Sequence, residues 1–424
     1  MKKFKLQNKI LSVSIIMLLT NSLFSQSTLS LEDVLATSIN ENIDIKIKTN
    51  ELSQVKNYEK VGVLGVLPKI KLNGSASGNQ GTSSLEFATD DFPTIDDAES
   101  ESKSINGNVE FSYNLFNGLG SIYTYQKLKR QSDLKSVELL IQIEQILVKT
   151  AKQYFDVAYL QENNKIISEV LDISKDRYNR IKVQNEFGNA SKLDLLSAEI
   201  DLNNDSVKLM NSEYELEEAK RQLNQTLNKS LDSEFNVENS VNINRDLIYS
   251  DLKQETLKNN NNILFQKYIV EIAKKDKKIN SVSILPRVNI SAQYGYNNTE
   301  SNTSIILDQT NLGLTGFINF SWDIFDGLAN RKITQNTKIQ IESNKLQLDA
   351  INLQIEQEFN STYQQYLNNV SLIDSAIKKS ELGLNPQIDG QLMRLPIPNL
   401  SEERRSEMKK MIKSMGEKCK VSIR

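Results

Sequence analysis

The residues best suited to chemistry in this 424-residue sequence are carboxylates that occur in pairs. Asp90-Asp91 and Asp96-Asp97 lie in an acidic stretch, and paired acids can bind calcium or act as an acid and a base. Histidine is absent and Cys419 is the only cysteine, which removes the usual general base and any thiolate cage within one chain. No phosphate-binding glycine loop or nucleophile motif accompanies the acids. We therefore interpret the pairs as solvated loop charges and expect no enzyme activity, cofactor or metal.

A duplicated motif indicates how the chain is organised. FSYNLFNGL at Phe111–Leu119 recurs as FSWDIFDGL at Phe320–Leu328, and each copy precedes a long proline-free helical pattern. A Leu-Pro, which fits the start of a strand, precedes each copy. We expect a structural repeat of helix, strand, loop, strand and long helix at 26–243, and an incomplete second one at 244–370.

The strands of both repeats alternate apolar and polar residues. Polar loops are expected between them, at Gly78–Ser104 and Asn297–Asp308. A soluble sheet with one buried face would alternate in the same way. The aromatic-rich apolar face and the export signal described below favour a membrane strand, with one face toward lipid and the other toward a lumen. The expected lipid-facing residues are Val109, Phe111, Tyr113, Leu115, Ile318, Phe320, Trp322 and Ile324, and the expected lumen-facing residues are Glu110, Ser112, Asn114, Asn319, Ser321 and Asp323.

The N-terminus resembles an export signal. Four lysines precede the apolar run Ile10–Leu19, which as a helix spans only about 15 Å, too short for a bilayer. Residues 1–25 are therefore expected to be a signal peptide. The net charge of −3 gives no basic field for nucleic acid.

Long helices account for most of the remaining sequence. Helical spacing predicts helices at Leu29–Lys60, Leu119–Asn185 and Asp251–Lys278, with a short strand or two within Phe235–Ile243. The break EFGNASKLDLL at Glu186–Leu196 predicts a hairpin tip. There Gly188 takes a left-handed conformation, and Ser191 with Asp194 forms a capping box for a helix that runs to about Leu227.

Four strands with an apolar outer face cannot close a barrel, and open edges in lipid leave backbone groups unpaired. The chain is therefore expected to assemble with copies of itself, and three copies would give twelve strands. The predicted fold is a mixed α and β membrane protein. The polar faces of the strands would line a lumen, which the long helices continue on the periplasmic side.

The order of these features resembles the TolC family of outer-membrane efflux proteins over residues 29–368. The residues that carry the resemblance are LSLEDVL at Leu29–Leu35, the Leu-Pro strand starts, NLFNG, DIFDG and FGNASKLDLLSA. The resemblance implies a homotrimer in the cell outer membrane, with helices in the periplasm. In the implied fold, long antiparallel helical hairpins form a periplasmic α-barrel, and four strands per protomer contribute to a trimeric 12-stranded β-barrel. A periplasmic adaptor and an inner-membrane pump are the implied partners, in a tripartite efflux or type I secretion system. The tip, with Gly188, Ser191, Asp194 and Leu195, would meet those partners, although Ser191 and Asp194 equally serve as a helix cap.

Residues 371–424 depart from that pattern. RLPIPNLSEERR at Arg394–Arg405, with KVSIR at Lys420–Arg424, resembles ribosome recycling factor, and this family implies contacts with ribosomal RNA. From Gln391 onward nine Lys or Arg face four Asp or Glu, within a chain that is acidic overall. We interpret this tail as a fragment joined to an unrelated chain.

Other interpretations remain beside the efflux channel. They are a soluble periplasmic structural coiled-coil protein, a non-functional truncated chimera and, least favoured, a ribosome-binding factor. Outer-membrane fractionation would distinguish the efflux channel from the soluble coiled-coil protein, and co-sedimentation with ribosomes would support the ribosome-binding factor.

Overall fold

A computed structural model describes residues 28–60, 67–85, 94–239, 247–303 and 306–381. The predicted signal peptide at 1–25 and the tail beyond Glu381 lie outside the described residues. The chain divides into a helical unit (Met1–Asn50, Glu138–Asn261 and Asn352–Arg424) and a sheet unit (Glu51–Val137 and Asn262–Ile351). Among the described helices, none combines the length and the apolar character needed to cross a membrane.

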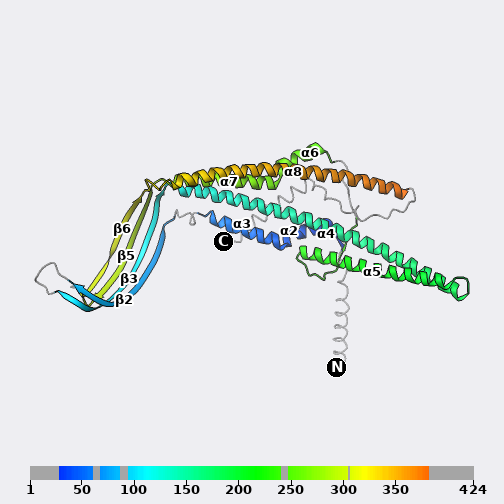
Figure 1. The fold of residues 1–424 in the computed structure, drawn as a ribbon, viewed down its shortest axis with the longest axis horizontal. Helices are drawn as coiled ribbons and strands as arrows, with labels where there is room; N and C mark the ends of the chain where they lie inside the picture. The colour runs from blue at the N-terminus through cyan, green and yellow to red at the C-terminus, as the bar shows by residue number, and fades with distance from the viewer. Residues whose placement is uncertain (1–27, 61–66, 86–93, 240–246, 304–305, 382–424) are drawn as a thin grey trace, which may run out of the picture. The chain divides into compact units, whose positions relative to one another are not determined.

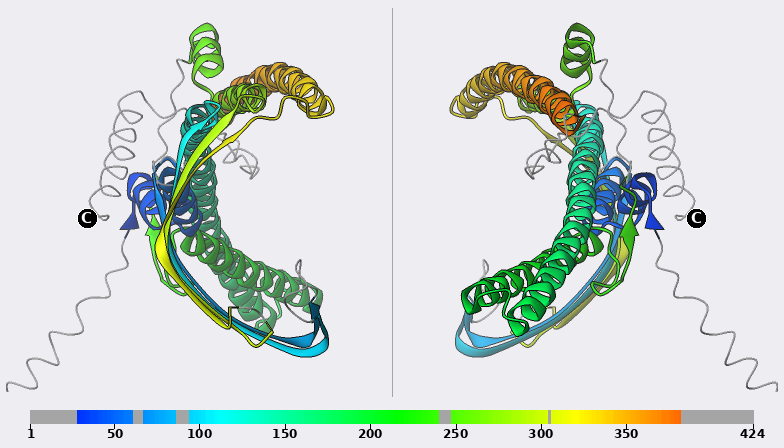
Figure 2. Two further views of the ribbon diagram at one scale, coloured as in Figure 1. Left: turned by 90° about the vertical axis from the view of Figure 1, so that its left-hand side faces the viewer. Right: turned by 90° about the vertical axis from the view of Figure 1, so that its right-hand side faces the viewer.

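The sheet unit is built on one antiparallel sheet of four long strands. In chain order these are β2 (Lys69–Leu85), β3 (Ile95–Asn117), β5 (Arg287–Ser301) and β6 (Asp308–Ser321). They lie side by side in the order β2-β3-β5-β6, with β2 and β6 at the two edges (Figure 1). Figure 2 shows that the sheet is strongly curved.

The strands extend beyond the predicted apolar segments. The prediction of a loop over Gly78–Ser104 is wrong for most of its length, because Gly78 pairs with Lys103 and Ser83 with Ala98. The predicted loop at Asn297–Asp308 is likewise shortened by pairs such as Asn297 with Asn311. Ladder hydrogen bonds join backbone groups, so a polar stretch can continue a hairpin once the apolar part has fixed its register.

The helices follow the predicted order, with two breaks. Their bounds are α2 (Leu31–Glu41), α3 (Ile43–Tyr58), α4 (Gly120–Glu186), α5 (Lys192–Thr226), α6 (Tyr249–Asn259), α7 (Asn261–Val282) and α8 (Ala329–Glu381). The helix predicted over Leu29–Lys60 is interrupted at Asn42, and the one predicted over Asp251–Lys278 is interrupted at Asn260. Both asparagines adopt an extended backbone conformation.

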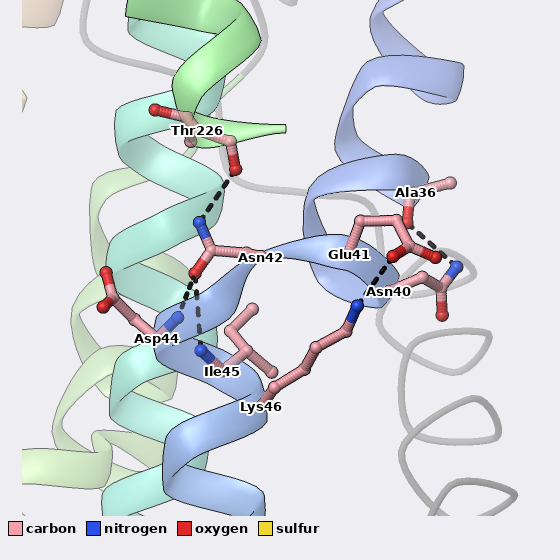
Figure 3. A network of polar contacts seen from close by, with 8 residues as sticks. All are labelled: Ala36, Asn40, Glu41, Asn42, Asp44, Ile45, Lys46 and Thr226. Carbon is pink, nitrogen blue, oxygen red and sulfur yellow. Dashed lines mark hydrogen bonds and ion pairs between the residues drawn. The ribbon is translucent and has the colours of Figure 1, made fainter. Parts of the chain in front are cut away.

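The break at Asn42 is stabilised by its side chain (Figure 3). The amide oxygen accepts hydrogen bonds from the backbone N–H groups of Asp44, at 3.0 Å, and Ile45, at 3.3 Å. The amide nitrogen donates to the carbonyl of Thr226 at the end of α5, at 2.8 Å. Asn42 therefore caps α3 and links it to a helix distant in sequence, which helical periodicity alone does not indicate.

The core of the helical unit joins α2, α4 and the end of α5. Its buried members are Val34, Tyr154, Val157, Ala158, Leu223, Leu227, Phe235 and Val237. A two-residue strand, β1 (Thr28–Leu29), pairs in parallel with β4 (Asn236–Val237) beside this core. The predicted strand near Phe235 is thus confirmed as β4, whereas Val241 and Ile243 lie outside the described residues.

The two halves of the chain repeat the same elements at nearly constant spacing. α6 begins 218 positions after α2, and β5 begins 218 positions after β2. Tyr154 and Tyr363 lie 209 positions apart, as do the two copies of the duplicated motif. Each tyrosine hydroxyl donates to the residue two before a short helix, Tyr154 to the carbonyl of Leu29 and Tyr363 to that of Leu247, both at 3.1 Å.

Candidate functional site: the strand faces and the hairpin tip

The register of the sheet sorts the predicted residues onto two faces. Directly paired residues of neighbouring antiparallel strands lie on the same face. Val109, Phe111 and Tyr113 pair with Tyr294, Ala292 and Ile290 of β5, which in turn pair with Leu314, Gly316 and Ile318 of β6. On the other side, Ile70 and Leu72 of β2 pair with Phe111 and Val109. Val109, Phe111, Tyr113 and Ile318 therefore share one face, and Phe320, two residues after Ile318 in β6, belongs to it as well. We call it the apolar face.

The apolar face is exposed in the single chain. Leu72 is 82% exposed, Leu314 73% and Ile318 74%. On β3 the face extends from Ile105 to Phe116, whose partners Asn298 and Val288 are ten residues apart in β5. At about 3.4 Å per residue this is about 34 Å along the strand. A strand tilt of about 40° would reduce this length to about 26 Å across a membrane, close to the height of a barrel's apolar band. Beyond Ile105 the same face carries Lys103 opposite Glu300, so the apolar band ends there.

The opposite face carries polar side chains that hydrogen-bond from strand to strand. Glu110, Ser112 and Asn114 pair with Gln293, Ser291 and Asn289. The amide of Asn289 donates to Asn114 at 2.8 Å. We call this the polar face. Asn319 pairs with Asn289, and Ser321 pairs with Arg287, so both predicted β6 residues belong to it.

Several members of the polar face were not predicted. Asn73 of β2 donates to Asn108 at 3.0 Å, and Asn108 donates to Gln293 of β5 at 3.3 Å. These amides link β2, β3 and β5 across the face. Phe317 is an apolar exception, because it pairs with Ser291 and is 49% exposed. Alternation along each strand would have identified all four residues once the strand ends were known.

Leu115 does not hold the position expected from simple alternation. The register shifts between Asn114 and Phe116, so Leu115 is the extra residue of a β-bulge. Phe116 pairs with Val288, which pairs with Phe320, and so Phe116 continues the apolar face. The prediction for Leu115 is corrected in this respect, because a bulge changes the side-chain period of two on which the prediction rested.

The fourth strand is shorter than predicted. β6 ends at Ser321, so Trp322, Asp323 and Ile324 lie after the strand and not within it. Ser321 pairs with Arg287, the first residue of β5, and no described strand lies beyond β6 to pair with later residues. The indole N–H of Trp322 instead donates to the carbonyl of Ile284 at 3.1 Å.

The hairpin tip between α4 and α5 has the predicted local structure. Gly188 has a φ of +75°, and its N–H donates to the carbonyl of Asn185 at 3.0 Å. The N–H of Asn189 donates to the carbonyl of Gln184 at 2.8 Å, which completes a Schellman motif. This ending of α4 needs a left-handed residue, and glycine supplies it without a Cβ penalty.

A capping box begins α5. The hydroxyl of Ser191 accepts from the N–H of Asp194 at 3.1 Å, and the carboxylate of Asp194 accepts from the N–H of Ser191 at 3.0 Å. The side-chain and backbone hydrogen bonds from Ser191 lower the pKa of Asp194. Gly188, Ser191 and Asp194 are exposed, and Leu195 is half-buried.

The tip also presents apolar side chains that sequence reasoning did not single out. Phe187 is 77% exposed and Leu193 is 75% exposed, on either side of the turn. Neither contributes to a helical stripe facing a core, so periodicity gave no reason to select them. The tip therefore combines a hydrogen-bonded turn with an exposed apolar surface.

The acid pairs do not form a metal site in the described part of the chain. Asp90-Asp91 lie outside the described residues, and Asp96-Asp97 lie in β3 and not in the expected loop. Among the residues that the structure describes, no group of three or more His, Cys, Asp or Glu is placed to hold a metal ion.

Comparison with known proteins reveals two distinct likenesses. Residues 61–229 match the family model described as outer membrane efflux protein, and residues 324–424 match the model for ribosome recycling factor. The second match overlaps α8, so it extends further than the predicted tail at 371–424. Both resemblances stated from the sequence are confirmed.

Solved structures of outer-membrane channels share the fold. The outer-membrane channel OprN is 16% identical, with a TM-score of 0.59, over 86% of this chain and 82% of that chain. The CmeC outer membrane channel of Campylobacter jejuni is 14% identical, with a TM-score of 0.58, over 86% of this chain and 79% of that chain. This likeness establishes the fold: mostly helical, with a four-stranded sheet.

Curated relatives match only a short segment. The ribosome-recycling factor of Sorangium cellulosum (strain So ce56) is 61% identical over 57 residues, which are 13% of this chain and 31% of that protein. The factor of Zymomonas mobilis is 49% identical over a segment of the same length. The chain thus spans about a third of the length of the curated relatives it matches.

Proposed function

We propose that this chain is the outer-membrane channel of a tripartite efflux or type I secretion system. The observation that carries the proposal is the sheet with one exposed apolar face, about 34 Å long along β3, and one polar face. An exposed apolar surface of this size is costly in water but suits lipid. The polar face, with Glu110, Ser112, Asn114, Asn319 and Ser321, would then line a water-filled lumen. The channel conducts its substrate and performs no catalysis.

Assembly follows from the two open edges of the sheet. Within lipid every strand edge must be paired, so one chain with four strands requires copies of itself. A homotrimer would supply twelve strands, an even number within the range of bacterial barrels. In this arrangement the helical unit lies in the periplasm, and residues 1–25 direct export.

The hairpin tip would contact the rest of the machine. Its exposed Phe187 and Leu193, with Gly188, Asp194 and Leu195, form a surface suited to a periplasmic adaptor and, through it, an inner-membrane pump. The tip is held rigid by the Schellman motif and the capping box. A preorganised surface binds at a lower entropic cost than a loop that must be ordered first.

A matched pair of variants tests the two faces. Leu314 and Thr315 are neighbours in β6, with Leu314 on the apolar face and Thr315 on the polar face. Leu314→Lys would place a charge in lipid at a cost of about 2–4 kcal/mol, whereas Thr315→Lys would place it in water. Outer-membrane fractionation and the yield of a heat-sensitive trimer on gels measure the effect. We expect strong loss for Leu314→Lys only. A soluble periplasmic monomer with equal yields of both variants would favour the structural coiled-coil protein instead.

We also propose that residues 371–424 are a fragment of ribosome recycling factor joined to an unrelated chain. The support is the high identity of a 57-residue segment that covers only 31% of the relative. Sequencing the DNA across codons 365 to 395, with mass spectrometry of the C-terminal peptide, tests this. A continuous product that co-sediments with ribosomes would overturn the proposal and support a ribosome-binding role.

A further inference from the structure

The two copies of the duplicated motif end their strands at different points. In β3 the residues after Ser112 have no partner in β2, whose first residue, Lys69, pairs with Ser112. They stay in the strand up to Asn117 because β5 pairs with them. In β6 the equivalent of Ser112 is Ser321, which pairs with the first residue of β5, and the strand ends there. The residues after Ser321 lack the neighbour that β5 provides for β3.

The turns after the two strands show the same difference. Gly118-Leu119 and Gly327-Leu328 have nearly identical left-handed backbones, with φ of 65°, 66°, 67° and 65°. A Cβ added at Gly118 would lie 2.9 Å from the Cβ of Leu285 and 2.9 Å from the carbonyl oxygen of Val282. A Cβ added at Gly327 would meet no atom within 4 Å. The second turn thus has the shape of the first without the segment that packs against it.

We infer that a second copy of this chain supplies the missing neighbour, in a register fixed by the internal repeat. This inference rests on the proposed function, because it requires the protomers to pair edge to edge. β5 is equivalent to β2, so β6 of one protomer pairs with β2 of the next as β3 pairs with β5. β6 follows β3 by 209 positions in the duplicated motif, and β5 follows β2 by 218 positions. With these offsets, the observed pair of Asn114 with Asn289 corresponds to Asp323 opposite Lys71 of the partner subunit. Transferring the pair of Phe111 with Ala292 places Phe320 opposite Gly74 of the partner subunit.

In this register, the residues that pair between protomers lie on matching faces of the sheet, and the charged pair has opposite signs. Phe320 and Gly74 both belong to the apolar face, whereas Ser321 and Asn73, the next pair, both belong to the polar face. A slip of one residue would put apolar side chains on the polar face. Asp323 follows β6 and Lys71 lies in edge strand β2, so the register brings opposite charges together on the lumen side.

Closure within one chain does not provide the same pairing. A closed sheet of eight strands leaves an interior only just wide enough for side chains. Four strands would leave no room for the polar face, which carries large residues such as Gln293 and Phe317. The open edges β2 and β6 therefore fit two different copies of the chain.

Disulfide trapping tests the register. Lys71→Cys with Asp323→Cys, in full-length protein with Cys419→Ser, should form disulfides between protomers on oxidation in outer membranes. Heated, non-reduced samples should then show a covalent trimer, which disappears on reduction. Each single cysteine variant should remain monomeric after heating. Asn114→Cys with Asn289→Cys, the observed equivalent, should form a disulfide within one chain and confirm that the geometry allows the bond.

A shifted pair separates the register from the assembly. Lys71→Cys with Asn319→Cys places both cysteines on the same face but four residues out of register, and it should give at least tenfold less covalent trimer. If the shifted pair cross-links better, or if only the Asn114 and Asn289 pair closes while the heat-sensitive trimer persists, the register is wrong and the channel proposal stands. If Lys71→Cys with Asp323→Cys closes within a monomer and no trimer forms, both proposals fail.

Charge exchange gives an independent result. Lys71→Asp should reduce the fraction of heat-sensitive trimer severalfold, because the new carboxylate would face Asp323 of the partner subunit as well as Glu110, which pairs with position 71 within the chain. Lys71→Asp with Asp323→Lys should restore it. A double variant no better than the single one would contradict the proposed pair.

Discussion

The two repeats share their local structure but differ in how much of it is buried. In the first repeat α5 returns along α4, and Val34, Tyr154, Val157 and Leu223 form a core with it. In the second repeat α7 buries Ile263, Val270 and Ala273, but α8 has Ile355 as its only buried apolar residue among the described positions, and α6 has none. The repeated motif thus specifies strands, turns and helices, whereas the core around Tyr154 also requires the returning helix and the segment after it.

The two equivalent tyrosines show this difference at a single atom. The hydroxyl of Tyr154 lies 3.1 Å from the carbonyls of both Leu29 and Glu238, and burial raises its pKa. Glu238 follows β4, which the chain reaches only after α5. The hydroxyl of Tyr363 is hydrogen-bonded to Leu247, the equivalent of Leu29. The second half therefore reproduces the contact within the repeat and not the one that depends on the returning helix.

Truncating one leucine in each repeat should give the largest difference in the free energy of unfolding. Leu223 is fully buried at the end of α5, whereas Leu353 of α8 is 69% exposed. Leu223→Ala should lower the free energy of unfolding by about 2–5 kcal/mol, since it leaves a cavity. Leu353→Ala should change it by less than about 0.5 kcal/mol. Thermal denaturation of the detergent-solubilised protein measures both, and similar shifts would show that α8 has a core of its own.

The cap that links α3 to α5 should have the next largest effect. Asn42→Ala removes two capping bonds and leaves the buried carbonyl of Thr226 without its donor, so we expect a loss of about 1–3 kcal/mol. Asn40, two residues earlier and exposed, provides the control (Figure 3). Asn40→Ala should change stability by less than about 0.5 kcal/mol. Equal losses would mean that the link to α5 contributes little.

The two equivalent tyrosines allow a comparison in which each variant removes a single hydroxyl group. Tyr154→Phe leaves two carbonyls near a buried ring, and it should cost about 1–2 kcal/mol. Tyr363→Phe should cost less, about 0.5 kcal/mol, because the residue is half-buried and its hydroxyl contacts one carbonyl. Chemical denaturation of both variants at one pH provides the measurement. The reverse order would contradict the greater burial of the first repeat.

The smallest expected effect is at the tip, and it depends on pH. The pKa of Asp194 is lowered in the folded state, so its capping contribution is complete above the ordinary carboxyl pKa. That contribution is lost as the pH falls through the lowered pKa. Amide protection factors in the first turn of α5 should decrease over this range. Asp194→Asn should remove the pH dependence, whereas protection that declines equally in this variant would show another group to be responsible.

Short-range rules allowed much of this protein to be predicted. The alternation of Val109 to Asn114 was sufficient to assign two faces, because side chains in a strand alternate regardless of what lies next to it. Gly188, Ser191 and Asp194 were sufficient to predict the tip, because a Schellman motif and a capping box involve only neighbouring residues.

The features that were not predicted depend on segments distant in sequence. β3 extends through a polar stretch because β2 and β5 pair with it. β6 stops at Ser321 because β5, the one strand that pairs with it, begins opposite that residue. Asn42 breaks a helix by binding the end of α5, 184 positions away. The sequence by itself determined the repeat, the faces and the tip, since these rest on spacing along the chain. Only the tertiary structure decided the strand ends, the bulge and the core, because each depends on which segments pack together.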